Sequence, residues 1–109
     1  MELDFITQTD FENLDKKGHI VINALADWCT ACGEYKKDIP ELKELAETNY
    51  VKMFNMKVDP INESFFEKYK CETLPYTFVF ANGEFVGGDS FNKDSASQLL
   101  MALGGVIPE

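Results

Sequence analysis

The residues His19 to Ala26 (HIVINALA) form a nearly unbroken apolar run, and this run constrains the fold more than any other stretch of the sequence. A strand with one solvated face alternates apolar and polar residues, whereas a strand buried on both faces is apolar throughout. The run therefore predicts a strand in the middle of a parallel sheet, with helices covering both of its faces.

Helices and strands are predicted to alternate on either side of this run. Asn82-Gly83 is the strongest short hairpin signal, so the last strand should return antiparallel, and Gly87-Gly88 should break or bulge it. The expected helices cover residues 7–17 with Thr9 as N-cap, 29–48 with a kink at Pro40, 61–69 with Ile61 on the apolar face, and 94–103. The expected strands cover 51–58, 77–80 and 84–86, with room for a short strand near residues 3–6.

This order of elements predicts an α/β fold with a central mixed sheet of four or five strands and helices on both faces. The chain has 109 residues, which suits a single domain over residues 1–109 and is too short for two ordinary domains. A chain of this size can bury one core without disulfide or metal staples.

The charge balance argues against some classes of partner. The chain has 19 acidic and 10 basic side chains, a net charge of −9 and no basic stripe, so we expect no nucleic-acid binding. It also lacks an apolar run of about 18 residues, so we expect no membrane insertion. The acidic start Met1-Glu2-Leu3-Asp4 is unlike a signal peptide and favours a cytoplasmic location. We also expect a monomer. The alternative is a periplasmic or other extracytoplasmic protein from which a signal or anchor was trimmed.

Two of the three cysteines, Cys29 and Cys32, lie where the apolar run gives way to a helix. Residues i and i+3 in a first helical turn are about 5–6 Å apart, within reach of a disulfide. Unpaired N–H groups at the helix start stabilise a thiolate on Cys29, which is the species that attacks disulfides. Cys32 lies one turn further and can resolve a mixed disulfide. Such an exchange needs no metal and no organic cofactor, because the Cys29–Cys32 disulfide is itself the redox group.

Other interpretations of the pair are less well supported. A structural disulfide that closes so short a loop would constrain the unfolded chain little. Zinc needs four ligands, and only Cys71 and His19 remain, neither with a second ligand nearby, so we predict no metal site. A chance Cys-x-x-Cys is less expected after a buried strand and beside Trp28.

The segment ADWCTAC at residues 26–32, followed by TLPYT at 73–77 and NG at 82–83, resembles the thioredoxin family. The resemblance covers nearly the whole chain, with the elements in the same order. It implies the thioredoxin fold, redox activity as a protein-disulfide reductase, protein disulfides as substrates and an electron-donating reductase as partner.

The resemblance also implies roles for individual residues. It makes Cys29 the nucleophile and Cys32 the resolving cysteine. It implies that Trp28 shields the site, although a single Trp is also a common core residue. It implies that Pro75 is cis and that Leu74 before it lies at the substrate groove, where the proline loop packs beside the cysteines.

The dipeptide between the cysteines departs from the family pattern. Thr30 and Ala31 stand where common thioredoxins have Gly-Pro, and the resemblance implies that this dipeptide tunes redox potential and substrate choice. The motif is also similar to the C-terminal domain of the bacterial thiol:disulfide interchange reductase, which gives the alternative of a periplasmic-type electron relay domain. A third alternative is a non-catalytic thioredoxin-fold interaction module, against which the intact cysteine pair argues.

A second departure concerns a buried charged pair of the family. Asn23 occupies the position of a buried Asp, and Asn55 that of its usual Lys partner. Two neutral amides can hydrogen-bond each other and avoid the cost of desolvating two charges. We hypothesise that the resolving step lacks a carboxylate base at this position, and that Asp27 or solvent water serves instead.

Three smaller features complete the candidate site. Gly33 follows Cys32 where the family often has a cation, so the nearest cations in sequence are Lys36 and Lys37. The family glycine at the substrate groove has no clear match, and Phe91 lies nearest its place. Cys71 is expected to be a small, buried packing residue.

Overall fold

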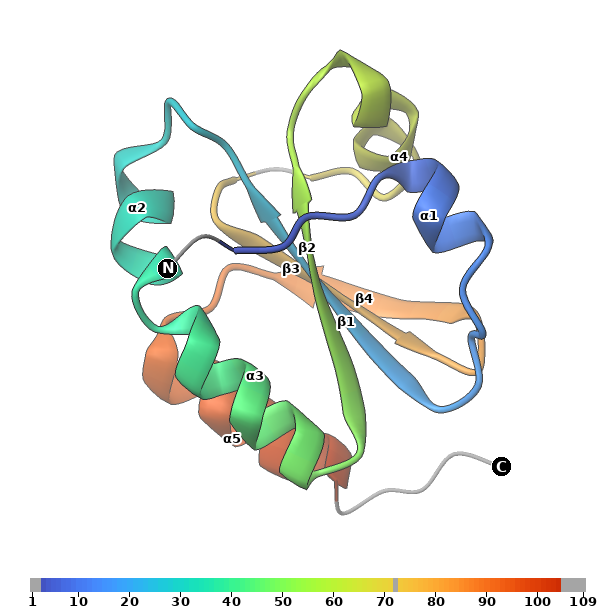
Figure 1. Ribbon diagram of the computed structural model, residues 1–109, viewed down its shortest axis with the longest axis vertical. Coiled ribbons are helices and arrows are strands. Elements are labelled where there is room, and N and C mark those ends of the chain that lie inside the picture. Colours follow the sequence, from blue (N-terminus) through green and yellow to red (C-terminus); the bar gives the residue numbers. More distant parts are fainter. Residues whose placement is uncertain (1–2, 72, 105–109) are drawn as a thin grey trace.

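One mixed sheet organises the computed structural model, which describes residues 3–71 and 73–104 (Figure 1). Its strands are β1 (His19–Leu25), β2 (Val51–Lys57), β3 (Tyr76–Ala81) and β4 (Glu84–Asp89). Their order in the sheet is β2-β1-β3-β4, with β1 parallel to β2 and every other pairing antiparallel. The expected mixed sheet is confirmed with four strands, the lower of the two expected numbers. The prediction that β1 lies in the middle of a parallel sheet is wrong on one side, because β3 runs antiparallel to β1.

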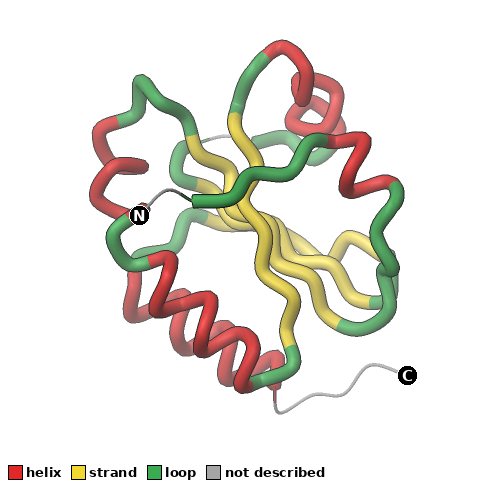
Figure 2. Tube along the Cα trace, in the orientation of Figure 1, coloured by secondary structure: helices red, strands yellow, loops and turns green. Residues whose placement is uncertain are grey.

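Helices lie on both sides of this sheet, as expected (Figure 2). They are α1 (Gln8–Glu12), α2 (Thr30–Lys36), α3 (Ile39–Thr48), α4 (Glu63–Lys68) and α5 (Lys93–Gly104), with a short 3-10 helix η1 (Pro60–Asn62) before α4. Helices α3 and α5 lie side by side on one face, whereas α1 and α4 lie towards the other (Figure 1). No helix in the described part of the chain is long and apolar enough to cross a bilayer.

All seven positions of β1 are buried, which confirms its place between two helical layers. Because side chains alternate along a strand, β1 supplies both cores. Val21 and Leu25 pack in the core that α2, α3 and α5 cover, whereas Ile20 and Ile22 pack among the phenylalanines of the α1 and α4 side. By the same alternation Asn23 belongs to the face that α2 covers.

The hairpin between β3 and β4 forms at Asn82-Gly83, as the sequence predicts. Both residues have positive φ angles, 50° and 87°, as a two-residue turn of this kind requires. The strand pairing shifts between Val79 and Phe80, and β4 continues through Gly87-Gly88 to Asp89. The glycine pair therefore accompanies a bulge and does not end the strand.

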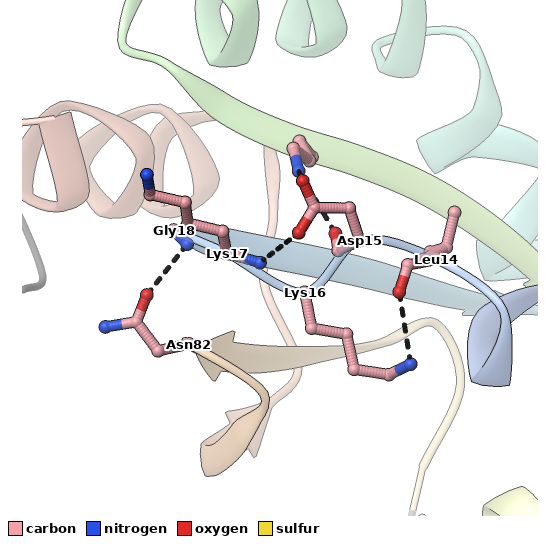
Figure 3. A network of polar contacts seen from close by, with 7 residues as sticks. Leu14, Asp15, Lys16, Lys17, Gly18 and Asn82 are labelled. Carbon is pink, nitrogen blue, oxygen red and sulfur yellow. Dashed lines mark hydrogen bonds and ion pairs between the residues drawn. The ribbon is translucent and has the colours of Figure 1, made fainter.

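Asn82 also ties this hairpin to the turn that precedes β1 (Figure 3). Its side-chain oxygen accepts the N–H of Gly18 at 2.9 Å, and its own N–H donates to the Gly18 carbonyl at 2.9 Å. Gly18 has φ +82°, a conformation that favours glycine. This double contact fixes where β1 begins relative to the sheet edge.

Several predicted helix bounds are wrong. Helix α1 ends at Glu12, and its N-cap is Thr7, whose hydroxyl accepts the N–H of Asp10 while the Asp10 carboxylate accepts that of Thr7. The predicted helix is interrupted between Lys36, where α2 ends, and Ile39, where α3 begins. Pro40 therefore lies in the first turn of a new helix and does not kink a continuous one. Ile61 belongs to η1 and is 73% exposed. At the N-terminus, the only described pairing is a single bridge from Ile6 to Met56.

Candidate active site

The cysteine pair lies at the start of α2, just past the end of β1. Cys29 is the N-cap of α2, with extended backbone, and its Sγ accepts the backbone N–H of Cys32 at 3.1 Å. The Cys29 N–H donates to the Ala26 carbonyl at 3.2 Å, which closes the turn between strand and helix. A sulfur that accepts a helix N–H is better placed to carry negative charge.

The two sulfurs differ in environment, and both are free thiols. Cys29 is half-buried, whereas Cys32 is fully buried at 0% exposure. Burial and the hydrogen bond with Cys29 raise the pKa of Cys32 to about 11. Cys32 is therefore a protonated thiol at neutral pH, and Cys29 is the sulfur that a disulfide can reach.

The residues around the pair are exposed. Trp28 is 74% exposed, which excludes the interpretation as a core residue, and Thr30 and Ala31 also face solvent. The aromatic ring and the dipeptide thus lie on the outer surface beside the cysteines.

The proline loop packs beside the cysteines. The Leu74–Pro75 peptide bond is cis, as the resemblance implies, and the half-buried Leu74 packs against the core that includes Cys32. The Ser90 hydroxyl donates to the Pro75 carbonyl at 2.9 Å. The local sequence does not indicate Ser90, because no local pattern links a loop after β4 to a turn before β3.

Beside Ser90, a hollow of about 380 Å³ lies on the Ala31 side of the cysteine pair. Phe91 and Pro75 help to line it. Phe91 therefore lies close to the proline loop, on the Ala31 side of the cysteine pair.

A buried polar network lies on the α2 side of β1. The Asn23 side-chain N–H donates to Asn55 Oδ1 at 3.1 Å, as predicted from the paired substitution, and Asn23 Oδ1 accepts the Thr77 hydroxyl at 3.1 Å. Asn55 in turn donates to the Asp4 carbonyl at 3.3 Å. The three side chains satisfy one another without a charge, although the sequence alone did not reveal Thr77.

Asp27, the alternative base, lies in solvent. Its carboxylate pairs with Lys57 at 3.3 Å and with Lys36 at 3.9 Å, and its side chain is 71% exposed. Lys36 is therefore close to the two cysteines, as expected, and its charge acts on Cys32. Lys37 instead pairs with Glu34 at 3.4 Å. Lys57 is the last residue of β2, and nothing in the local sequence indicates that it lies beside Asp27.

A recess of about 430 Å³ opens beside Cys29. Its lining includes Trp28, Leu74, Phe66 and Cys71. Cys71 packs against the core as expected, but it is only half-buried and so does not have the full burial that we predicted. Burial raises the pKa of Cys71 to about 11, so its thiol is protonated at neutral pH.

Comparison with known proteins agrees with this geometry. A family model described as Thioredoxin matches residues 3–103. The sequence matches none of the curated proteins with which it was compared.

Solved structures of thioredoxins superpose over most of the chain. Mitochondrial thioredoxin 3 from Saccharomyces cerevisiae, in its oxidised form, is 19% identical with a TM-score of 0.78, covering 92% of this chain and 94% of that one. The oxidised thioredoxin from Plasmodium falciparum is 20% identical with a TM-score of 0.77, covering 94% and 99%. Thioredoxin from Fasciola hepatica is 25% identical with a TM-score of 0.76, covering 88% and 93%. The chain belongs to the thioredoxin family, and its adjacent cysteines support thiol–disulfide oxidoreductase chemistry in general.

Proposed function

We propose that this protein reduces protein disulfides by dithiol–disulfide exchange, with Cys29 as nucleophile and Cys32 as resolving thiol. The unequal burial of the two sulfurs carries the proposal. Cys29 is accessible and accepts a helix N–H, whereas Cys32 is fully buried with a raised pKa. In such a pair the accessible sulfur attacks the substrate disulfide, and the buried sulfur later resolves the mixed disulfide.

In the first step the Cys29 thiolate attacks one sulfur of the substrate disulfide. A bond forms between Cys29 Sγ and that sulfur, the substrate S–S bond breaks, and the other substrate sulfur leaves as a thiolate with the electron pair. The product is a mixed disulfide between the protein and its substrate.

In the second step Cys32 resolves this intermediate. The Cys32 thiol gives its proton to solvent, and its sulfur attacks Cys29 Sγ, which breaks the mixed disulfide. The second substrate thiolate leaves and takes up a proton, so the substrate gains two electrons and the protein gains a Cys29–Cys32 disulfide. Asn23 and Asn55 are neutral amides, so no carboxylate from this position takes part.

We further propose that the substrate lies across Trp28 and the Leu74–Pro75 loop. Leu74 lines the recess beside Cys29, and Trp28 flanks the same recess. An electron-donating reductase then returns the disulfide to the dithiol. The family membership supports both partners in general.

Reduction of insulin by dithiothreitol tests this function. We expect the wild-type protein to accelerate insulin reduction and the Cys29→Ser variant to lose the acceleration. The Met101→Ser variant changes an exposed side chain of α5, serves as control and should keep it. Equal rates for wild type and Cys29→Ser would favour a non-catalytic interaction module.

A further inference from the structure

We propose that a hollow lined by lysines, between the N-terminal segment, the end of β2 and the end of α2, is a docking site for an acidic segment of a partner protein. This lysine hollow has a volume of about 720 Å³. It is separate from the recess beside Cys29, because the two have no described lining residue in common.

The charge of the lysine hollow is opposite to that of the chain. Its described lining residues include three cations, Lys36, Lys37 and Lys57, and one anion, Asp27. Lys37 pairs with Glu34, which leaves Lys36 and Lys57 as the principal cations. The whole chain has 10 basic and 19 acidic side chains, so its net charge repels an acidic segment elsewhere. The local charge therefore selects both the partner and the place where it docks.

The fold brings the two principal cations together on one aromatic side chain. Ile6 pairs with Met56, and both pack on the α1 and α4 side of the sheet. Because side chains alternate along an extended chain, Phe5 and Lys57 point to the opposite side, where α2 ends at Lys36. The centre of the Phe5 ring is 5.1 Å from the Lys57 ammonium and 6.0 Å from that of Lys36. These cation–π contacts hold the two cations beside each other.

Lys36 and Lys57 are held in place and still have donors to offer. Their side chains are only 30% and 38% exposed, and both pair with the Asp27 carboxylate, at 3.9 Å and 3.3 Å. Within the described residues, neither ammonium group has another ion pair or a hydrogen bond to any other residue. An ammonium group has three N–H donors, so most of these donors are available to a carboxylate from outside.

Asp27 itself shows that a carboxylate fits between the two cations. Its side chain is 71% exposed and can therefore leave the position when a partner carboxylate arrives. Leu3, Phe5 and Pro40 give the hollow an apolar margin. A segment with an apolar residue between acidic ones thus fits better than an acidic segment alone.

The lysine hollow is close to the cysteines. Asp27 is two residues before Cys29, and the charge of Lys36 acts on Cys32. A protein held here by an acidic segment is therefore near enough to exchange with Cys29. This consequence rests on the proposed function, whereas binding itself needs no thiol chemistry.

Titration with synthetic peptides, followed by NMR, tests the docking site. The probe is a peptide in which Glu residues flank a Leu, and the same peptide with Gln in place of Glu is its neutral control. At low salt we expect wild type to bind the acidic peptide about tenfold more tightly than the neutral one, with signals shifting around Lys36 and Lys57. High salt should weaken this binding.

A matched pair of double variants isolates the two cations. Lys36→Gln with Lys57→Gln removes them, and Lys17→Gln with Lys68→Gln removes two exposed cations that do not line the hollow, so both proteins have the same net charge. The first variant should bind the acidic peptide about tenfold more weakly, and the second should bind it nearly as wild type does.

A second matched pair isolates the internal carboxylate. Asp27→Asn removes the group that competes with the peptide, so binding should become about two- to fivefold tighter. Asp15→Asn removes a carboxylate that pairs with Lys52 at 3.9 Å, and it should leave binding nearly unchanged.

The outcomes separate the docking site from the proposed function. Equal binding of acidic and neutral peptides, or equal losses in the two double variants, would overturn the docking site. Binding of glutarate as tight as that of the peptide would also overturn it, because the hollow would then hold a free small anion. A protein that binds the acidic peptide but does not accelerate insulin reduction would instead overturn the proposed function.

Discussion

At the scale of single residues, the two active-site sulfurs should differ in their reaction with iodoacetamide. Thiolates react and thiols do not, and Cys32 and Cys71 both have pKa values raised to about 11 by burial. At pH 7 to 8 we expect one carbamidomethyl group per reduced protein, on Cys29. Peptide mapping by mass spectrometry checks the site, and Cys32 and Cys71 should react only as the pH approaches 11. Modification of Cys32 ahead of Cys29 would contradict the assignment of roles.

Asn23→Asp tests the neutral amide network. The new carboxyl is fully buried, so its pKa should be raised, and the charged form should cost about 1–3 kcal/mol of folding free energy. Because the folded-state pKa exceeds the unfolded one, this loss should be small below about pH 4 and grow as pH rises through the folded value. Urea denaturation at acid and neutral pH checks this.

The matched control for Asn23→Asp is Gln98→Glu, which makes the same chemical change on the exposed side of α5. It should change stability little at either pH. The Asn23→Asp protein should also gain a base for the resolving step, which alters the pH profile of disulfide exchange. Coincident profiles for wild type and Asn23→Asp across neutral pH would refute the idea that the step lacks a carboxylate here.

Local sequence predicted some of these residues and not others. Cys29, Cys32 and the cis Pro75 carry their signal in short motifs. Ser90 and Lys57 do not, because each acts through a contact with a residue far away in sequence. Register across β1 and β2 pairs Asn23 with Asn55, which is why two separate substitutions could be interpreted together.

At the scale of elements, the glycine after the cysteine pair makes α2 less stable than it could be. An added Cβ at Gly33 meets no heavy atom within 4 Å, and its φ is not positive. Gly33→Ala should therefore stabilise the protein by about 0.5–1 kcal/mol.

Gly18→Ala is the matched control, since its Cβ also meets open space but its φ is +82°. It should destabilise by about 1 kcal/mol. Urea denaturation measures both, and equal effects would contradict the role of backbone conformation.

Element types were predictable where a local signal dominates. The unbroken apolar run of β1 and the Asn82-Gly83 turn both appear as expected. The errors arose where local signals compete: the Pro40 position suits a helix start as well as a kink, and Thr7 with Asp10 outcompetes Thr9 as the cap. Ile61 has helical spacing, but Pro60 opens a 3-10 turn that leaves it in solvent.

At the scale of the whole molecule, the buried thiols should make stability fall in alkali. Cys32 and Cys71 each have a pKa raised from 9.0 to about 11 by folding. Between those values the unfolded chain has lost protons that the folded chain retains, so unfolding is increasingly favoured as pH rises. The stabilisation that the two protonated thiols contribute to the folded state is fully present below pH 9 and is lost as pH rises through 11. Chemical denaturation of the reduced protein over this window should show the decline, and Cys32→Ala and Cys71→Ala should each have a shallower slope. Parallel curves for all three proteins would contradict this.

The recess beside Cys29 illustrates why the sequence could not predict the whole site. Its lining comes from the turn before α2, from Val58 after β2, from Phe66 in α4 and from the loop before β3. Motif spacing placed Trp28 and Leu74 near Cys29. Val58 and Phe66 carry ordinary apolar patterns, and only the packing of α4 against the sheet brings them to the same recess.

Capture of the mixed disulfide tests the central claim most directly. In Cys32→Ser, Cys29 can attack a disulfide substrate but the intermediate cannot be resolved, so the covalent complex should accumulate. Mass spectrometry of this variant after reaction with a disulfide peptide should find the peptide joined to Cys29. Cys29→Ser with Cys32 intact is the control and should capture none. A complex joined at Cys71, or none in Cys32→Ser, would contradict the account.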